Sequence, residues 1–256
     1  KFAAESPTRA ARWEMSVLEG VRVVELSTRG VAAWAGSHLA DWGAEVQILE
    51  PAGGSPLRTA PPVDGAGSAL WTWLSRGKRS AAVGTDLSPA DALELCRRAD
   101  LVLADSDAVP AVLGLDARSL EDLLRPGTAS LVVAAPFGLD GPYASYRVGD
   151  LGIAAKSGWM TMVRDPGREP LRAGLDFGYR GAGALMLVTA LAALEKAVNP
   201  GTTLASNPST ISITRSPAGG TGHDGCRVTC STPKSCASSR RAAARMPGQR
   251  VPSAIV

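Results

Sequence analysis

The chain has 256 residues, of which 45% are hydrophobic and 20% are charged. This length and composition allow a full domain core and exclude wholesale disorder. The longest apolar run, residues 184–194, is too short to cross a membrane, and residues 1–14 contain no apolar core typical of a secretory signal. We therefore expect a cytoplasmic protein without a membrane segment.

The formal charge of +3 comes entirely from the end of the chain. Residues 201–256 hold seven of the 27 Lys and Arg residues but only one of the 24 acids, so residues 1–200 carry a net charge of −3. The basic balance therefore does not indicate nucleic-acid binding by the body of the chain. That body contains one cysteine, Cys96, which fits a reducing compartment.

Short apolar segments alternate with helix-compatible segments through the first half of the chain. Residues 21–26 are an apolar, β-branched run, and the small residues of 31–42 end at Gly43. Ser88 precedes Pro89 and Asp91, the pattern of an N-cap, a first-turn proline and an acid three residues after the cap. The pattern predicts strands at 21–26, 45–49, 80–83, 101–104 and 130–135, and helices at 31–42, around 70–74, at 89–99 and at 119–124.

This alternation predicts right-handed parallel crossovers between neighbouring strands. We therefore expect an α/β fold, an open, doubly wound, mostly parallel sheet with flanking helices, similar to a Rossmann domain. Beyond the sheet, residues 150–159 are predicted to be helical, 163–178 irregular, and 180–197 a long helix of small residues.

The composition changes at about Val198. Residues 198–256 are rich in Ser, Thr and basic clusters and show no sustained hydrophobic period. Two interpretations stand, a disordered basic tail or out-of-frame translation of GC-rich coding sequence, and we favour the second. The predicted organisation is an N-terminal extension at 1–17, an α/β domain at 18–197 and an irregular tail at 198–256.

Several common ligand motifs do not occur in the sequence. The loop at 27–33 has one glycine instead of G-x-G-x-x-G, and there is no Walker A motif, which argues against NAD, FAD and nucleotide phosphate transfer. Only two histidines, His38 and His223, are present, which argues against a Ser-His-Asp or Cys-His hydrolase. The spacing of His223, Cys226, Cys230 and Cys236 matches no common zinc pattern, so we predict no metal and no tightly bound cofactor.

Six segments in a fixed order give the sequence a family resemblance. They are residues 18–51, 53–58, 76–80, 137–143, 150–158 and 174–195. Together they resemble the N-terminal half of the family III CoA-transferases, the CaiB/BaiF group, and the resemblance covers about residues 18–197.

The resemblance implies a doubly wound α/β domain followed by a smaller domain that is incomplete here. It also implies an interlocked homodimer whose substrates are an acyl-CoA donor and a carboxylic acid acceptor. In this family an aspartate attacks the thioester carbonyl, which gives a mixed anhydride and then an enzyme-bound CoA thioester. Some members instead racemise α-methylacyl-CoA.

The resemblance places the nucleophilic aspartate at position 179, which holds Tyr179 in this chain. Asp176 is the nearest carboxylate; it is either a substitute in a reshaped turn or an ordinary turn residue. Asp150 falls where the family has an acid facing the active site.

The resemblance also implies residues that contact CoA. The loop after the first strand lacks the family's Gly-Pro, and Asp105-Ser106 replaces its Asn-Phe, so that an acid near a CoA phosphate would repel it. Arginine and lysine suit the phosphates of CoA. The implied CoA contacts are Thr28, Arg29, Gly30, Val31, Arg58, Lys78, Arg79, Asp105 and Arg147.

Three hypotheses follow. The first is an acyl-CoA:carboxylate CoA-transferase of family III type, or the N-terminal half of one. The second is a catalytically silent half that binds CoA or serves as the dimerisation partner in a tandem protein, which fits Tyr179. The third, a racemase, ranks below them because it needs an acid/base pair for proton exchange.

Overall fold

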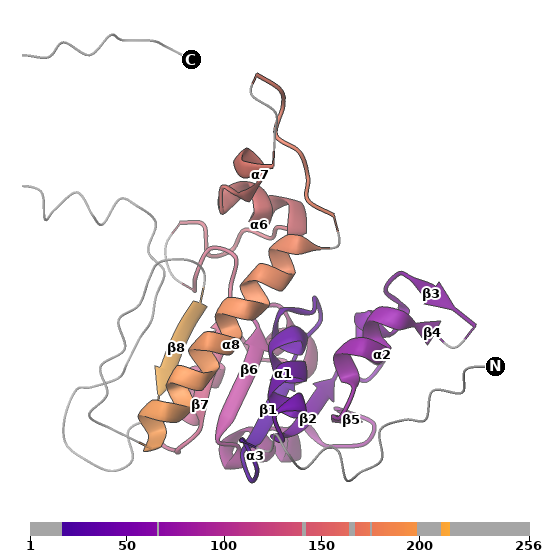
Figure 1. Cartoon of the computed structure of the whole chain (residues 1–256). Coiled ribbons are helices and arrows are strands. Elements are labelled where there is room, and N and C mark those ends of the chain that lie inside the picture. Colours follow the sequence, from indigo (N-terminus) through magenta and orange to yellow (C-terminus); the bar gives the residue numbers. More distant parts are fainter. Residues whose placement is uncertain are drawn as a thin grey trace, which may run out of the picture.

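The computed structural model describes residues 17–65, 67–139, 142–163, 167–174, 176–198 and 211–215. Its main element is a six-stranded sheet in the order β5-β2-β1-β6-β7-β8 (Figure 1). Neighbouring strands from β5 to β7 pair in parallel, and β8 runs antiparallel to β7. The strands are β1 (Arg22–Leu26), β2 (Glu45–Glu50), β5 (Arg79–Ala82), β6 (Leu101–Asp105), β7 (Ser130–Ala134) and β8 (Ile211–Arg215). The predicted α/β fold with a mostly parallel sheet is confirmed.

The helices lie on both faces of this sheet, as predicted for a doubly wound fold. Ser88 caps α3 by accepting the N–H of Asp91, and Pro89 stands in its first turn. Six short elements were not predicted: α4, α7, the 3₁₀ turn η2 (Pro56–Thr59), the two strands β3 (Val63–Asp64) and β4 (Gly67–Ser68) of a separate hairpin, and β8, which lies in the tail predicted to be irregular. The helices are α1 (Val31–Asp41), α2 (Ala69–Ser75), α3 (Pro89–Arg98), α4 (Ala108–Leu113), α5 (Ala117–Leu124), α6 (Asp150–Lys156), α7 (Trp159–Met162) and α8 (Phe177–Val198).

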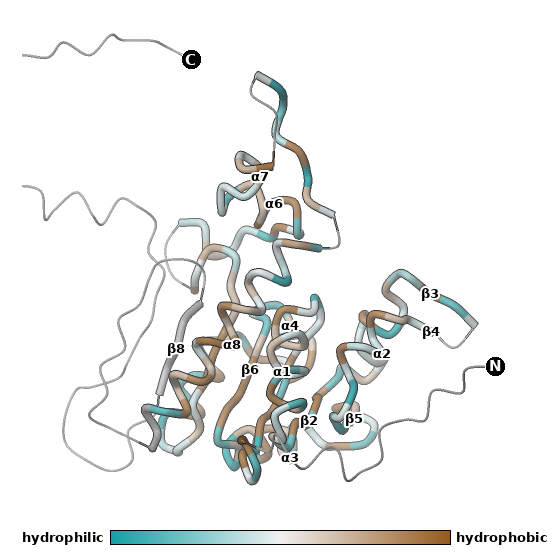
Figure 2. Tube along the Cα trace, viewed as in Figure 1, coloured by the Kyte–Doolittle hydropathy of each residue, from teal (hydrophilic) through white to brown (hydrophobic). Residues whose placement is uncertain are grey.

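The core forms two layers because successive side chains of a strand point to opposite faces. Val23 of β1 joins the layer under α1 and α8, whereas its neighbour Val24 joins the layer under α3, α4 and α5. Leu101 and Val102 of β6 divide in the same way. Figure 2 shows the hydrophobic colouring along β6, which is buried on both faces. The unbroken apolar strands in the sequence follow from this double burial.

Helix α8 packs along α1 and the sheet. Met186 and Ala190 are fully buried there, and a Cβ at Gly183 would lie 2.9 Å from the Cβ of Trp34, so glycine permits the close crossing of α1 and α8. By length and composition alone the segment Phe177–Glu195 could also cross a membrane. A core helix of this composition meets the same criterion, but only 33% of the segment is buried here, and Leu185 and Val188 are exposed.

The C-terminal stretch contributes one described element. Residues Ile211–Arg215 form β8, which pairs with β7 at the edge of the sheet (Figure 1). The other residues of the tail predicted at 198–256, except Val198 at the end of α8, lie outside the described residues, as do residues 1–16 of the predicted extension.

A buried ion pair links β1 to the segment before β5 under α1. Lys78 Nζ lies 2.6 Å from Glu25 Oε2 and donates a second hydrogen bond to the carbonyl of Ala33 at 2.8 Å. Both side chains are almost fully buried. A Cβ at Gly36 would collide with the Glu25 carboxylate, so the glycine in α1 makes room for the pair. Burial lowers the pKa of Lys78, although the Glu25 carboxylate opposes the shift.

Lys78→Met should lower the free energy of unfolding by about 3–5 kcal/mol, because it leaves the Glu25 carboxylate buried without its partner. The double variant Glu25→Leu/Lys78→Met should regain much of this loss, since no buried charge remains. Urea unfolding measures both values. Arg79→Met, at an exposed neighbouring position, is the matched control and should change stability by less than about 0.5 kcal/mol. An effect of Lys78→Met no larger than that of the control would contradict the argument.

Candidate functional site

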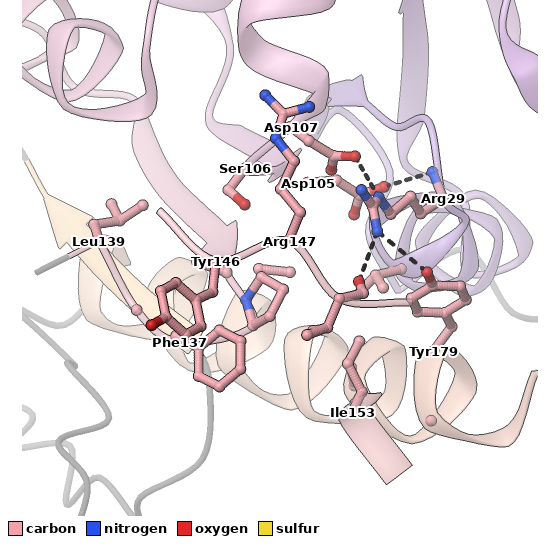
Figure 3. A pocket seen from close by; sticks show the side chains of 18 of the residues that line it. Arg29, Asp105, Ser106, Asp107, Phe137, Leu139, Tyr146, Arg147, Ile153 and Tyr179 are labelled. Carbon is pink, nitrogen blue, oxygen red and sulfur yellow. Dashed lines mark hydrogen bonds and ion pairs between the residues drawn. The ribbon is translucent and has the colours of Figure 1, made fainter. Parts of the chain in front are cut away.

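A cavity of about 1350 Å³ opens at the carboxyl ends of β1, β6 and β7. In the sheet, β2 and β5 lie on one side of β1, while β6 and β7 lie on the other. The chain therefore leaves β1 toward one side of the sheet and leaves β6 toward the other. In open α/β sheets, ligands bind at the carboxyl ends of the two strands whose connections diverge in this way. Arg29 and Asp105 line the cavity from these two strand ends, and Phe137 and Tyr179 complete its wall (Figure 3).

Asp105 at the end of β6 holds the loop that follows β1. Its Oδ2 accepts the hydroxyl of Ser27 at 2.7 Å and the backbone N–H groups of Thr28 and Arg29, both at 3.2 Å. Its Oδ1 accepts the N–H of Ala32 in the first turn of α1 at 2.9 Å. One buried carboxylate thus fixes both the loop and the start of the helix.

This arrangement gives the aspartate a role that the sequence did not indicate. The sequence suggested that Asp105 would repel a CoA phosphate, but its carboxylate oxygens are directed at the backbone donors of its own chain. Burial raises the pKa of Asp105 to about 6, although the hydrogen bonds from Ser27, Ala32 and Arg29 oppose this shift. The loop is therefore held in place by a group that titrates near neutral pH.

Arg29 extends from the same loop across the cavity wall. Its Nε forms an ion pair with Asp107, and its Nη1 donates to the carbonyl of Val148 at 2.7 Å and to the Tyr179 hydroxyl at 3.4 Å. Figure 3 shows the guanidinium between Asp107 and Tyr179, with these interactions dashed. Arg29 therefore connects the β1 loop with the segment before α6 and with the first turn of α8.

The two carboxylates predicted beside Tyr179 lie in different surroundings. Asp150 is buried at the start of α6; its Oδ1 accepts the backbone N–H of Tyr179 at 3.0 Å and its Oδ2 lies 3.8 Å from Arg172. Asp176 is exposed, adopts a left-handed backbone conformation (φ 49°) and lies 3.5 Å from the same Arg172. Neither lines the cavity, so Asp150 positions Tyr179 and Asp176 remains outside.

The predicted CoA contacts divide into two groups. Arg29, Val31, Asp105 and Arg147 line the cavity, whereas Thr28 and Gly30 belong to the loop that carries Arg29. The other three lie apart, toward β2 and β5. Arg58 makes two 2.6 Å hydrogen bonds to buried Glu50, Lys78 is buried against Glu25, and Arg79 is exposed at the start of β5. They are not part of the cavity lining.

Several cavity residues were missed from the sequence. Phe137 and Tyr146 lie with their ring centroids 6.0 Å apart, and Lys156 Nζ lies 4.1 Å from the centroid of Phe137. Arg118 reaches the lining from α5 by donating to the carbonyl of Leu139 at 2.8 Å. The aromatic and basic side chains of 137–147 could have suggested a binding segment. Their place at the cavity follows only from the pairing of β7 with β6, which the sequence does not specify.

The described residues include no group of three His, Cys, Asp or Glu side chains that could hold a metal ion. The zinc-like spacing at His223 and Cys226–Cys236 lies outside the described residues. Cys96 lies in the core on α3, and burial raises the pKa of its thiol to about 12. The polar side chains that line the cavity are those of arginine, lysine, aspartate, serine and tyrosine.

A doubly wound domain with a cation-lined cavity at the carboxyl edge of its sheet is typical of proteins that bind phosphate-bearing ligands. The sequence profile of CoA-transferase family III matches residues 18–204. The chain therefore belongs to CoA-transferase family III, as the resemblance indicated.

Individual relatives agree with this assignment. The chain is 35% identical to the succinate–glutarate CoA-transferase of Agrobacterium fabrum over 172 residues, which cover 62% of this chain and 42% of that enzyme. It is 33% identical to the succinyl-CoA–D-citramalate CoA-transferase of Chloroflexus aurantiacus over 187 residues, 70% of this chain and 45% of that enzyme. The chain thus spans less than half the length of these relatives.

Solved structures show the same fold. A CaiB/BaiF family protein from Brucella suis superposes with a TM-score of 0.62 at 27% identity and covers 74% of this chain and 52% of that one. Rv3272 from Mycobacterium tuberculosis superposes with a TM-score of 0.57 at 27% identity, and the match covers 73% of this chain and 52% of Rv3272.

Asp105→Asn should change the pH dependence of stability. The raised pKa means that the folded state favours the protonated form of Asp105. The contribution of this group to the free energy of unfolding is therefore full below about pH 4 and is lost as the pH rises through about 6. The amide does not titrate, so the stability of the parent relative to the variant should fall by about 3 kcal/mol between pH 4 and 7. Urea unfolding at the two pH values measures this difference.

Asp116→Asn is the control with the opposite sign. The backbone N–H of Ser119 lowers the pKa of Asp116, so the parent should gain stability relative to this variant as the pH rises toward about 4 and should change little between pH 4 and 7. If the difference between the parent and Asp105→Asn is the same at pH 4 and 7, the titration assigned to Asp105 is wrong.

Proposed function

We propose that the protein takes part in the transfer of CoA between an acyl-CoA and a free carboxylic acid, and that this chain binds the CoA thioester in the cavity. The observation that carries the proposal is the combination of family membership with cations and aromatic rings around one cavity. In Figure 3, Phe137 and Tyr146 lie together at one end of the labelled group, and Arg29 and Tyr179 at the other. An extended ligand with phosphates and an adenine ring fits such a surface.

The acids named for the relatives are small dicarboxylates or their derivatives. Two relatives are called a succinate–glutarate and a succinyl-CoA–D-citramalate CoA-transferase. We propose substrates of this class for the present protein. In the proposed reaction an enzyme carboxylate attacks the thioester carbonyl and the CoA thiolate leaves, which gives a mixed anhydride. The thiolate then attacks the enzyme acyl carbon of the anhydride, which releases the donor acid and forms the enzyme-bound CoA thioester. The acceptor carboxylate attacks that thioester, and the freed thiolate attacks the acceptor carbonyl of the second anhydride, so that the acceptor leaves as its CoA thioester and the enzyme carboxylate is regenerated.

A second function, a catalytically silent CoA-binding half, is favoured by the surroundings of Tyr179. The position expected for the nucleophilic aspartate holds this phenol, on the first turn of α8. The carboxylates that line the cavity are all engaged: Asp105 with the loop, Asp107 with Arg29, and Asp116 with the N-terminus of α5. Relatives such as the BbsE subunit of a benzylsuccinate CoA-transferase are named as subunits, so we propose a second chain or second copy as the source of the nucleophile.

CoA should raise the melting temperature of the chain, and Arg147→Gln should reduce this effect. Arg147 lines the cavity and makes no hydrogen bond or ion pair with any described residue, so its guanidinium can serve a phosphate. Loss of one charge-assisted hydrogen bond should weaken CoA binding by about tenfold. Thermal shift with increasing CoA gives the affinity. Arg97→Gln, at an exposed position on α3, is the control. If the two substitutions change the affinity for CoA equally, Arg147 does not bind CoA.

Tyr179→Asp should create or increase thioester exchange, whereas Tyr179→Asn should not, because only the first variant supplies a carboxylate at this position. Exchange between succinyl-CoA and free glutarate is followed by mass spectrometry. Exchange already present in the parent and reduced by Asp176→Asn would favour Asp176 as the nucleophile. Equal exchange in the Asp and Asn variants would contradict the mapping of position 179. Deuterium incorporation at the α-carbon without exchange would support the racemase hypothesis instead.

A further inference from the structure

The Arg29 guanidinium has donors that the described residues do not use. Nε is engaged by Asp107, and Nη1 by Val148 and Tyr179. The second terminal nitrogen, Nη2, makes no hydrogen bond with any described residue, and the side chain is 30% exposed at the cavity wall. Arginine forms its strongest contacts with groups that present two coplanar oxygens or a phosphate.

The Tyr179 phenol adds a second donor beside this guanidinium. Its oxygen accepts an N–H from Arg29 at 3.4 Å, so the phenolic O–H proton remains available to another acceptor. The described residues contain no acceptor hydrogen-bonded to this O–H. Both donors line the same cavity.

The position of the phenol is fixed from two sides. The backbone N–H of Tyr179 is held by Asp150, and a Cβ at neighbouring Gly178 would lie 2.9 Å from the Asp150 carbonyl oxygen, so glycine allows α8 to approach α6 closely. The first turn of a helix also favours a negative charge nearby. Arg147 adds a cation to the same lining, which offsets the charge that Asp107 contributes beside Arg29.

We propose that Arg29 and Tyr179 together form a binding position for the carboxylate group of a small organic acid. This inference rests on the proposed function and assigns position 179 a binding role in place of attack. One carboxylate oxygen accepts from Nη2 of Arg29 and the other from the phenolic O–H of Tyr179. The occupant is the acceptor acid or the distal carboxylate of a dicarboxylic acyl group. No bond is formed or broken at this position, and Tyr179 keeps its proton.

Isothermal titration calorimetry with succinate, succinamide and inorganic phosphate tests the proposal. The parent chain should bind succinate at least about tenfold more tightly than the neutral diamide, which lacks the charge. Inorganic phosphate, which arginine also binds through two oxygens, shows how much of the affinity the cation alone supplies. Tyr179→Phe keeps the ring and removes the donor, and it should weaken succinate binding by about tenfold. Tyr143→Phe, which removes an exposed phenol outside the cavity lining, is the matched control and should leave binding unchanged.

Three outcomes would overturn the proposal: no binding of succinate by the parent, equal binding of succinamide, or unchanged succinate binding by Tyr179→Phe. Arg29→Met is a second test, but Arg29 also holds Val148, so circular dichroism must show that this variant folds. The CoA-dependent melting shift separates the two proposals. A shift without succinate binding contradicts only the carboxylate position, and succinate binding without a shift contradicts only the proposed CoA binding.

Discussion

The hydrogen bonds that Asp105 accepts from the β1 loop are the interaction on which the site depends. They join the ends of the adjacent parallel strands β1 and β6. At this point the chain leaves β1 toward β2 on one side and leaves β6 toward β7 on the other. Without these hydrogen bonds, the N–H groups of Thr28, Arg29 and Ala32 would be left without this acceptor in a largely buried position, which is costly. Because Arg29 leaves the loop at this point, the same carboxylate fixes the direction in which its guanidinium crosses the cavity. The position of the cation is thus a consequence of a tertiary contact between β6 and the loop.

The α1 face of the sheet carries other buried acids, and each has a partner of its own. Glu25 is paired with Lys78, and Glu50 with Arg58, whose guanidinium lies 4.4 Å from the centroid of the Trp71 ring. An isolated buried carboxylate is costly, so such acids require a cation or several donors. These pairs use two of the basic residues that the family resemblance had assigned to CoA. The cavity receives its cations from elsewhere: Arg29 from the β1 loop, Arg118 from α5, and Arg147 and Lys156 from the segments after β7.

The sequence was sufficient to predict the alternating strands and helices. A strand that is buried on both faces is a short, continuous apolar run, and such runs stand out between the helical segments. The cap of α3 at Ser88 could be read directly from local chemistry. The role of Asp105 could not, because its donors lie more than 70 positions earlier in the chain and become neighbours only through the pairing of β1 with β6. The contact of Arg29 with Tyr179 spans 150 positions and depends in the same way on the crossing of α8 over α1.

The surroundings of Tyr179 distinguish binding from attack. A nucleophilic carboxylate has to approach a thioester carbonyl with an oxygen that no strong donor retains. In the described part of the chain, the acids near the cavity accept backbone hydrogen bonds or pair with arginine, and Asp176 points to Arg172 outside the lining. Arg29 and Tyr179, in contrast, offer donors to the cavity, and donors stabilise an anionic ligand. The geometry of the described residues is therefore suited to holding a negatively charged group in place.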